Sequence, residues 1–114
     1  MTTIYHNPRC SKSRQTLQLL EENNIQPEIR LYLQAPPSIE EIQALLTQLD
    51  ITPLELMRTK ETIYKELGLS KESTDEERLQ AMHTTPSLIE RPIVIHNDKA
   101  KIGRPPEDVL ALFK

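Results

Sequence analysis

Apolar and polar residues at the start of the chain follow a pattern that predicts a strand, a helix and a second strand. Residues 2–6 are largely β-branched or aromatic and end at an Asn-Pro turn, which predicts a short strand. Leucines at helical spacing follow Cys10, and the helix they predict ends by residue 24, because Pro27 cannot continue it. Residues 28–33 alternate in part and predict a second strand, parallel to the first through the crossover helix.

The middle of the chain carries helix-start signals instead of strand patterns. Residues 38–49 open with the capping box Ser-Ile-Glu-Glu and then place apolar residues on one face. Residues 52–58 repeat the signal with proline at the first helical position. Residues 62–67 predict a further helix that Gly68 ends, and residues 74–82 predict another.

Strand patterns return near the end of the chain. Residues 92–96 form an aliphatic run, residues 97–99 predict a turn, and residues 100–102 return as the antiparallel partner. Residues 103–106 lead into a last predicted helix, with Val109, Leu110 and Phe113 inward.

The predicted order is therefore β-α-β, several helices, then β-β-α. This order fits a single α/β domain over residues 1–114, with a four-stranded mixed sheet and a helical insertion at about 38–90 between the second and third strands. A length of 114 residues also favours one domain. The thioredoxin fold has this arrangement.

Composition and charge narrow the possible functions. Hydrophobic residues make up 37% and charged residues 27% of the chain, as in globular proteins. The longest aliphatic run, residues 93–95, is far too short to span a membrane, and residues 1–4 carry no signal-peptide pattern, so we expect a cytoplasmic protein. A net charge of −3 disfavours nucleic acid as a partner.

The chain has one cysteine, Cys10, at the point where the first strand gives way to a helix. A thiol at a helix N-terminus faces unpaired backbone N–H groups and the positive end of the helix dipole. Arg9, Lys12 and Arg14 add positive charge close by. A buried, inert cysteine would not need such a polar loop, so we expect a lowered pKa and a nucleophilic thiolate at Cys10.

Ser13 stands where a C-x-x-C motif would place its second sulfur. Any disulfide formed at Cys10 must therefore be resolved by another molecule, such as glutathione or a redoxin protein. The phosphatase loop C-x-x-x-x-x-R is excluded, because its arginine would fall at Thr16. The three histidines show no metal-ligand spacing with Cys10, so we expect no metal and no bound cofactor.

Four segments carry a joint family signal: YHNPRCSKSR at residues 5–14, LMR at 56–58, ERPIV at 90–94 and IGRP at 102–105. Together they resemble the glutaredoxin-linked arsenate reductases, the ArsC family, and the likeness runs from residue 3 to residue 113. The resemblance implies a thioredoxin-like fold with a helical insertion.

The resemblance also implies a reaction. A cysteine thiolate attacks arsenate, glutathione acts as co-substrate and reduces the adduct, glutaredoxin takes part, and arsenite is released. The site residues that it implies are Cys10 as the nucleophile, Arg58, Arg91 and Arg104 for the oxyanion, and His6, Ser13, Arg14 and Pro92 in support.

Elementary electrostatics gives that set a reason. An anionic nucleophile approaches an anionic substrate only where cations lower the repulsion, and the fork of arginine suits a tetrahedral oxyanion. Arg91 and Arg104 each precede a proline, which favours extended backbone at a strand boundary. By the same resemblance we predict a cis bond before Pro92. We interpret His6 and Ser13 as a hydrogen-bonded pair that orients the loop; the alternative is that His6 merely ends the first strand.

Two other functions remain open at this stage. The first is a glutathione-dependent thiol oxidoreductase with another substrate, acting on glutathione mixed disulfides. The second is a regulator like the Spx family, which shares the fold and binds RNA polymerase. Many Spx proteins carry C-x-x-C as a switch, whereas this chain has Ser13 at the second position.

Overall fold

The computed structural model describes residues 1–114, which divide into two compact units. The sheet unit comprises residues 1–35 and 91–114, and the helical unit comprises residues 36–90. The second range agrees closely with the predicted insertion at about 38–90, while the interpretation of the whole chain as one domain stays a prediction. None of the helices has the length and apolar character that a membrane span requires.

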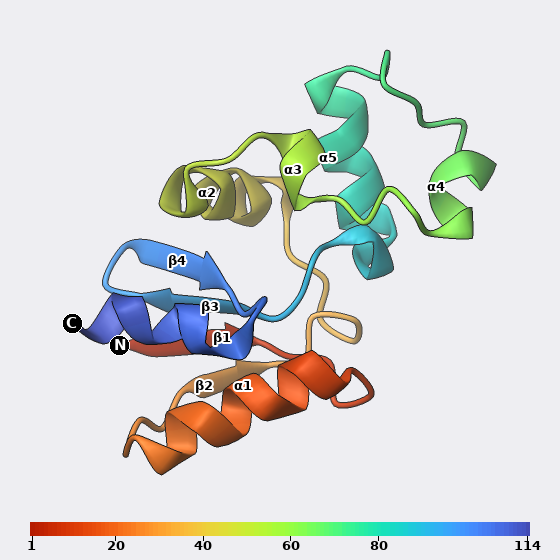
Figure 1. The fold of residues 1–114 in the computed structure, drawn as a ribbon. Helices are drawn as coiled ribbons and strands as arrows, with labels where there is room; N and C mark the ends of the chain where they lie inside the picture. Colours follow the sequence, from red (N-terminus) through yellow and green to blue (C-terminus); the bar gives the residue numbers. More distant parts are fainter. The chain divides into compact units, whose positions relative to one another are not determined.

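The sheet unit contains the predicted four-stranded mixed sheet (Figure 1). Its strands, in the order in which they lie side by side, are β2 (Glu28–Arg30), β1 (Thr2–Tyr5), β3 (Ile93–His96) and β4 (Lys99–Ile102). β1 pairs in parallel with β2 and antiparallel with β3, and β3 pairs antiparallel with β4. The carboxyl end of β1 and the start of β3 therefore lie together, because Tyr5 is opposite Ile93.

One face of this sheet is covered by the helix α1 (Ser11–Glu22) and the terminal helix η2 (Pro106–Phe113). Ile4 and Val94 are directly opposite in the register and point to this face, where they meet Leu20 of α1 and Val109 of η2. All four side chains are fully buried. Their burial holds the N-terminus of α1 at the end of β1.

The sheet unit departs from the predictions at three places. β2 ends at Arg30, before the predicted end at residue 33, because the chain turns there and the N–H groups of Gln34 and Ala35 donate to the Leu31 carbonyl. The turn between β3 and β4 is shorter than predicted. Asn97 and Asp98 both adopt positive φ, as a two-residue hairpin turn requires, and residue 99 already belongs to β4.

The third departure is the winding of the last helix. η2 is a 3₁₀ helix where the pattern predicted an ordinary helix, and its first hydrogen bond runs from the Asp108 N–H to the Pro105 carbonyl. Its eight residues make it longer than 3₁₀ helices usually are. The change leaves Val109 fully buried in the core, whereas Leu110 and Phe113 are only partly buried.

The helical unit contains the predicted middle helices. They are α2 (Ile39–Leu49), α3 (Pro53–Leu56), α4 (Thr62–Glu66) and α5 (Asp75–Thr84), with a 3₁₀ turn η1 (Pro86–Leu88) that the sequence did not predict. Capping boxes at Ser38, Thr52 and Thr74 begin α2, α3 and α5. Gly68, at a φ of 76°, follows the end of α4 as predicted.

Leu20 offers a test of the contact between α1 and the sheet. Replacing it with Ala should lower the free energy of unfolding by about 2–5 kcal/mol, because the change leaves a cavity beside Ile4 and Val94. The measurement is urea unfolding followed by circular dichroism. Gln18→Ala, on the exposed side of the same helix, should change it by less than about 0.5 kcal/mol. Equal effects of the two changes would contradict this packing.

Candidate active site

The loop from residue 6 to residue 10 places Cys10 at the N-cap of α1. Asn7 holds this loop through two acceptors. Its side-chain Oδ1 accepts the Arg9 N–H at 3.0 Å, and its backbone carbonyl accepts the Cys10 N–H at 3.0 Å. The Cys10 carbonyl accepts the first helical bond, from the Arg14 N–H. The half-buried sulfur thus lies at the positive end of a twelve-residue helix, where the sequence predicted it.

His6 and Ser13 form the predicted hydrogen-bonded pair beneath the loop. His6 Nδ1 lies 2.7 Å from Ser13 Oγ, both side chains are buried, and the same Oγ accepts the Asn7 N–H at 3.0 Å. Burial, and then the charge of Arg14, hold the pKa of His6 below its ordinary value. His6 is therefore a neutral ring near pH 7, and Ser13 joins the end of β1 to the first turn of α1.

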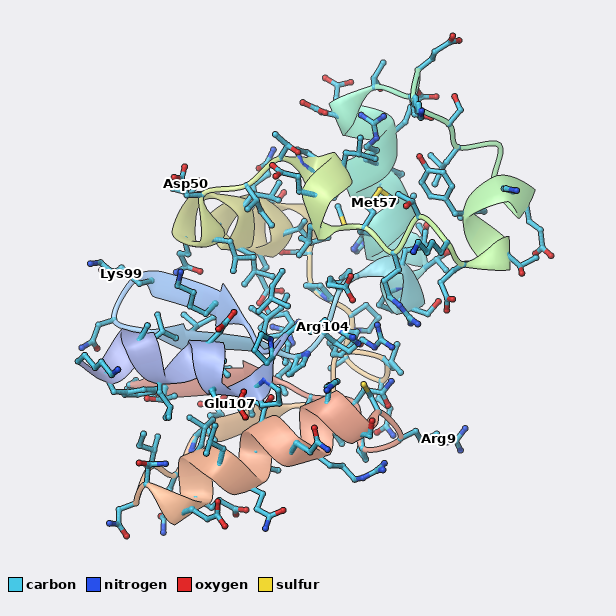
Figure 2. All side chains as sticks on the ribbon, viewed as in Figure 1. Arg9, Asp50, Met57, Lys99, Arg104 and Glu107 are labelled. Carbon is cyan, nitrogen blue, oxygen red and sulfur yellow. The ribbon has the colours of Figure 1, made fainter.

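Arg91 and Arg104 are brought to Cys10 from the start of β3 and the end of β4. The Arg104 Nε donates to the Arg91 carbonyl at 2.9 Å, and one of its terminal nitrogens lies 3.9 Å from Cys10 Sγ. The bond between Arg91 and Pro92 is cis, as predicted, and the bond between Arg104 and Pro105 is cis as well, which was not predicted. Figure 2 labels Arg104 at the end of β4 and Arg9 on the outside of the loop before α1.

Gly103 allows the backbone before Arg104 to pack directly against the nucleophile helix. A Cβ at this position would lie 2.5 Å from Thr16 Oγ1 and 2.9 Å from Pro92 Cγ. Thr16 is fully buried, and its hydroxyl donates to the Lys12 carbonyl at 2.8 Å. The Gly103 N–H donates to the Pro92 carbonyl at 2.9 Å. Only glycine permits this approach, and it fixes where the Arg104 side chain begins.

Opposing effects set the pKa of Cys10. Burial raises it, whereas the backbone N–H groups of Ser13 and Lys12 and the charges of Arg91 and Arg104 lower it, and the net result is below the ordinary value. The sulfur makes no full N-cap hydrogen bond, so these N–H groups act chiefly through their field. The predicted lowering of the pKa is confirmed.

The source of the stabilising charge differs from the sequence expectation. Arg9, Lys12 and Arg14 are close to Cys10 along the chain, but the cations that lower its pKa are Arg91 and Arg104. All three local side chains are exposed, and the Arg14 guanidinium donates to the Pro8 carbonyl at 2.8 Å. Arg14 therefore braces the loop, and its charge acts on His6.

The third predicted oxyanion ligand, Arg58, lies in the helical unit. There one terminal nitrogen forms an ion pair with Glu61 at 3.1 Å, and the other donates to the Ser87 carbonyl at 3.2 Å. These contacts hold the guanidinium within its own unit. The role of Arg58 in binding the oxyanion stays a prediction.

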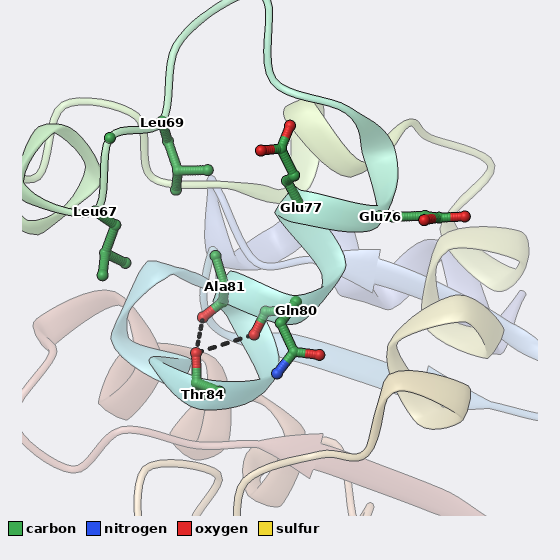
Figure 3. Close-up of a pocket in the computed structure, with 8 residues that line it drawn as sticks. Leu67, Leu69, Glu76, Glu77, Gln80, Ala81 and Thr84 are labelled. Carbon is green, nitrogen blue, oxygen red and sulfur yellow. Dashed lines mark hydrogen bonds between the residues drawn. The ribbon is translucent and has the colours of Figure 1, made fainter.

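One hollow in the helical unit is unsuited to an anion. This hollow has a volume of about 480 Å³, is lined by residues 67–69 and by side chains of α5, and carries the carboxylates of Glu76 and Glu77 (Figure 3). Because no cation lines it, an oxyanion would be repelled there. No three His, Cys, Asp or Glu side chains gather as a metal site.

Sequence reasoning missed Gly103 and Thr16 as parts of the site. A signal was present for the first, because Gly103 is one of only two glycines in the chain and directly precedes Arg104. Nothing in the local sequence marks Thr16. Its importance follows from the approach of the segment after β4, which is a tertiary contact.

Comparison with known proteins yields consistent matches along the whole chain. The sequence model of the ArsC family matches residues 5–112. An uncharacterized Escherichia coli protein, YfgD, is 56% identical over 96% of this chain and 93% of its own length. An arsenate reductase of Haemophilus influenzae is 52% identical over 96% of this chain and 97% of its own.

A solved arsenate reductase from Vibrio cholerae is 49% identical and superimposes with a TM-score of 0.94, covering 97% of this chain and 96% of its own. The fold class predicted from the order of elements, an α/β thioredoxin-like fold, is confirmed by this similarity and by the mixed sheet.

Arg104 can be tested as the counter-ion of the thiolate. Arg104→Gln should raise the pKa of Cys10, because the change removes a positive charge 3.9 Å from the sulfur. The pH at which half of Cys10 becomes a thiolate, followed by ultraviolet absorbance, should therefore move upward. Arg9→Gln, which removes an exposed charge that does not lower this pKa, serves as the control. An unchanged pKa in Arg104→Gln would contradict the geometry.

The two glycines provide a matched pair for testing the close packing. Gly103→Ala should lower the free energy of unfolding by about 1–3 kcal/mol and raise the pKa of Cys10, because Arg104 must shift with the backbone. Gly68→Ala meets no atom within 4 Å, so it should cost only about 1–2 kcal/mol from its positive φ and leave the thiol unchanged. The readouts are urea unfolding and thiol titration.

Proposed function

Because the chain belongs to the ArsC family, we propose that it is an arsenate reductase in which Cys10 is the nucleophile and glutathione supplies the second thiol. The observation that carries the proposal is the contact between the Arg104 guanidinium and Cys10 Sγ at the N-terminus of α1. This contact places a thiolate beside a guanidinium group, whose N–H donors bind oxyanions.

The first task of such a site is to let two anions meet. The guanidinium groups of Arg91 and Arg104 offset the negative charge of arsenate while they also stabilise the thiolate. Arg104 is anchored through its Nε, so a terminal nitrogen can pass from the sulfur to an arsenate oxygen with little movement. Arg58 is the proposed third ligand of the oxyanion.

The chemical step then balances as follows. The Cys10 sulfur forms a bond to arsenic, and one arsenate oxygen leaves as water after taking up protons. A glutathione thiolate next attacks the Cys10 sulfur, the sulfur–arsenic bond breaks, and its electron pair leaves with arsenic as arsenite. Arsenic gains two electrons, and the two thiols are left as a disulfide between Cys10 and glutathione.

The disulfide must be resolved from outside, because the chain has no second cysteine. Glutaredoxin, using glutathione, is the proposed reductant. A supply of reduced glutathione is typical of the cytoplasm, which is the proposed location. His6, Ser13 and Arg14 support the step by holding the loop, through the hydrogen bonds at Ser13 Oγ and the Pro8 carbonyl.

A second candidate function is supported by the same single cysteine. An enzyme that acts on glutathione mixed disulfides needs an activated thiolate and an external thiol, and Cys10 meets both needs. A switch like that of Spx proteins is less favoured, because the buried Ser13 is fully engaged in hydrogen bonds to His6 and Asn7.

Cys10→Ser tests the proposed reaction. Arsenite formation from arsenate, with glutathione and glutaredoxin present, should fall to the uncatalysed level, because an alcohol is far less ionised than a thiol at neutral pH. Arg104→Lys should retain a cation but lose the fork, and kcat/KM for arsenate should fall by about 10- to 100-fold. The measurement is the rate of arsenite release.

Lys12→Ala provides the control, because its exposed side chain contributes no charge to Cys10. It should change kcat/KM by less than about threefold. A wild-type protein that releases no arsenite with both reductants present would rule out the proposed reaction. A glutathione adduct on Cys10 in the same protein would then favour the second candidate.

A further inference from the structure

A small cavity lies beside the nucleophile loop, on the side away from Arg91 and Arg104. Its volume is about 280 Å³, and its walls come from the loop before α1 and the turn after β2. The lining residues that matter here are Asn7, Pro8, Arg9, Leu31, Leu33 and Gln34. We propose that this cavity binds glutathione when glutathione reacts at Cys10, an inference that rests on the proposed function and assigns a place to its co-substrate.

The character of the cavity differs from that of an oxyanion site. Leu31 and Leu33 form an apolar wall, and Leu33 is 42% exposed to solvent. Neither Arg91 nor Arg104 lines it. A small tetrahedral anion would gain little there, whereas a ligand with methylene groups could cover the leucines.

The polar groups around the cavity suit a peptide with a free carboxylate. The side-chain amide of Gln34 and the Nδ2 of Asn7 make no hydrogen bond, so both can bind peptide groups. The exposed guanidinium of Arg9 has no carboxylate partner in the protein. Arginine pairs strongly with carboxylates. Glutathione is a short peptide that carries two carboxylates and a chain of methylene groups.

The cavity is within reach of the nucleophile. Arg9 lines it and is bonded directly to Cys10, and neighbouring Cα atoms are about 3.8 Å apart. A tripeptide in extended form spans roughly 10 Å. A glutathione molecule whose carboxylate meets Arg9 is therefore long enough for its central thiol to reach the next residue, Cys10.

The test uses a reaction that needs no arsenate. Cys10 thiolate attacks glutathione disulfide, one sulfur–sulfur bond breaks, a new one joins Cys10 to glutathione, and a glutathione thiolate leaves. Because Cys10 is the only cysteine, intact mass spectrometry follows this single adduct. Hydroxyethyl disulfide, which has no carboxylate or peptide group, is the comparison oxidant.

Arg9→Ala should slow the reaction with glutathione disulfide about fivefold and leave the reaction with hydroxyethyl disulfide unchanged, because Arg9 does not lower the pKa of Cys10. Leu33→Asp should slow the glutathione reaction at least as much, since it places a carboxylate against those of the ligand. Leu33 is exposed, so this change should leave the fold intact.

Lys12→Ala is the matched control, because it removes an equal, exposed charge from the first turn of α1, at a position that does not line the cavity. It should slow the glutathione reaction by less than twofold. Equal effects of Arg9→Ala and Lys12→Ala, or equal effects of Arg9→Ala on both disulfides, would overturn the proposed site. Either result is independent of whether the protein reduces arsenate, which the arsenite assay measures separately.

Discussion

The structure is organised around the cost of holding one negative charge on the Cys10 sulfur. Partial burial disfavours the thiolate, and the protein offsets this with the field at the N-terminus of α1 and with the charges of Arg91 and Arg104. These groups stabilise the thiolate only at short range, because solvent screens the field of a more distant exposed charge. The fold must therefore bring separate segments together within a few ångströms.

The mixed sheet provides that approach. β1 delivers the nucleophile loop, and the antiparallel pairing with β3 and then β4 returns the chain so that Arg91 and Arg104 lie beside it. Gly103 then lets the segment after β4 touch Thr16 of α1, so the position of Arg104 is set by backbone packing. The backbone position of Arg104 is therefore fixed, and the hydrogen bond from its Nε to the Arg91 carbonyl restricts its side chain further.

The surroundings of Cys10 have two chemical characters. On one side lie guanidinium groups and backbone N–H groups, which suit a small oxyanion. On the other lies a cavity with a leucine wall, free amides and the unpaired charge of Arg9, which suits a peptide-like thiol. Under the proposed function, the first side would receive the oxyanion and the second the external thiol.

The sequence by itself determined the elements and the nucleophile. Capping boxes, prolines and the glycine after α4 are signals that act between chain neighbours, so the helices could be predicted from them. The cis bond before Pro92 was predicted from the family resemblance, and the pair of His6 with Ser13 from their places around the loop. Only the tertiary structure decided which cations serve Cys10. Electrostatic energy depends on distance through space. Proximity along the chain pointed to Arg9, Lys12 and Arg14 and the family resemblance named Arg91 and Arg104 for the oxyanion, but the fold decides that these last two lower the pKa of the thiol. The contact of Gly103 with Thr16 was hidden for the same reason, because it joins segments far apart in the chain.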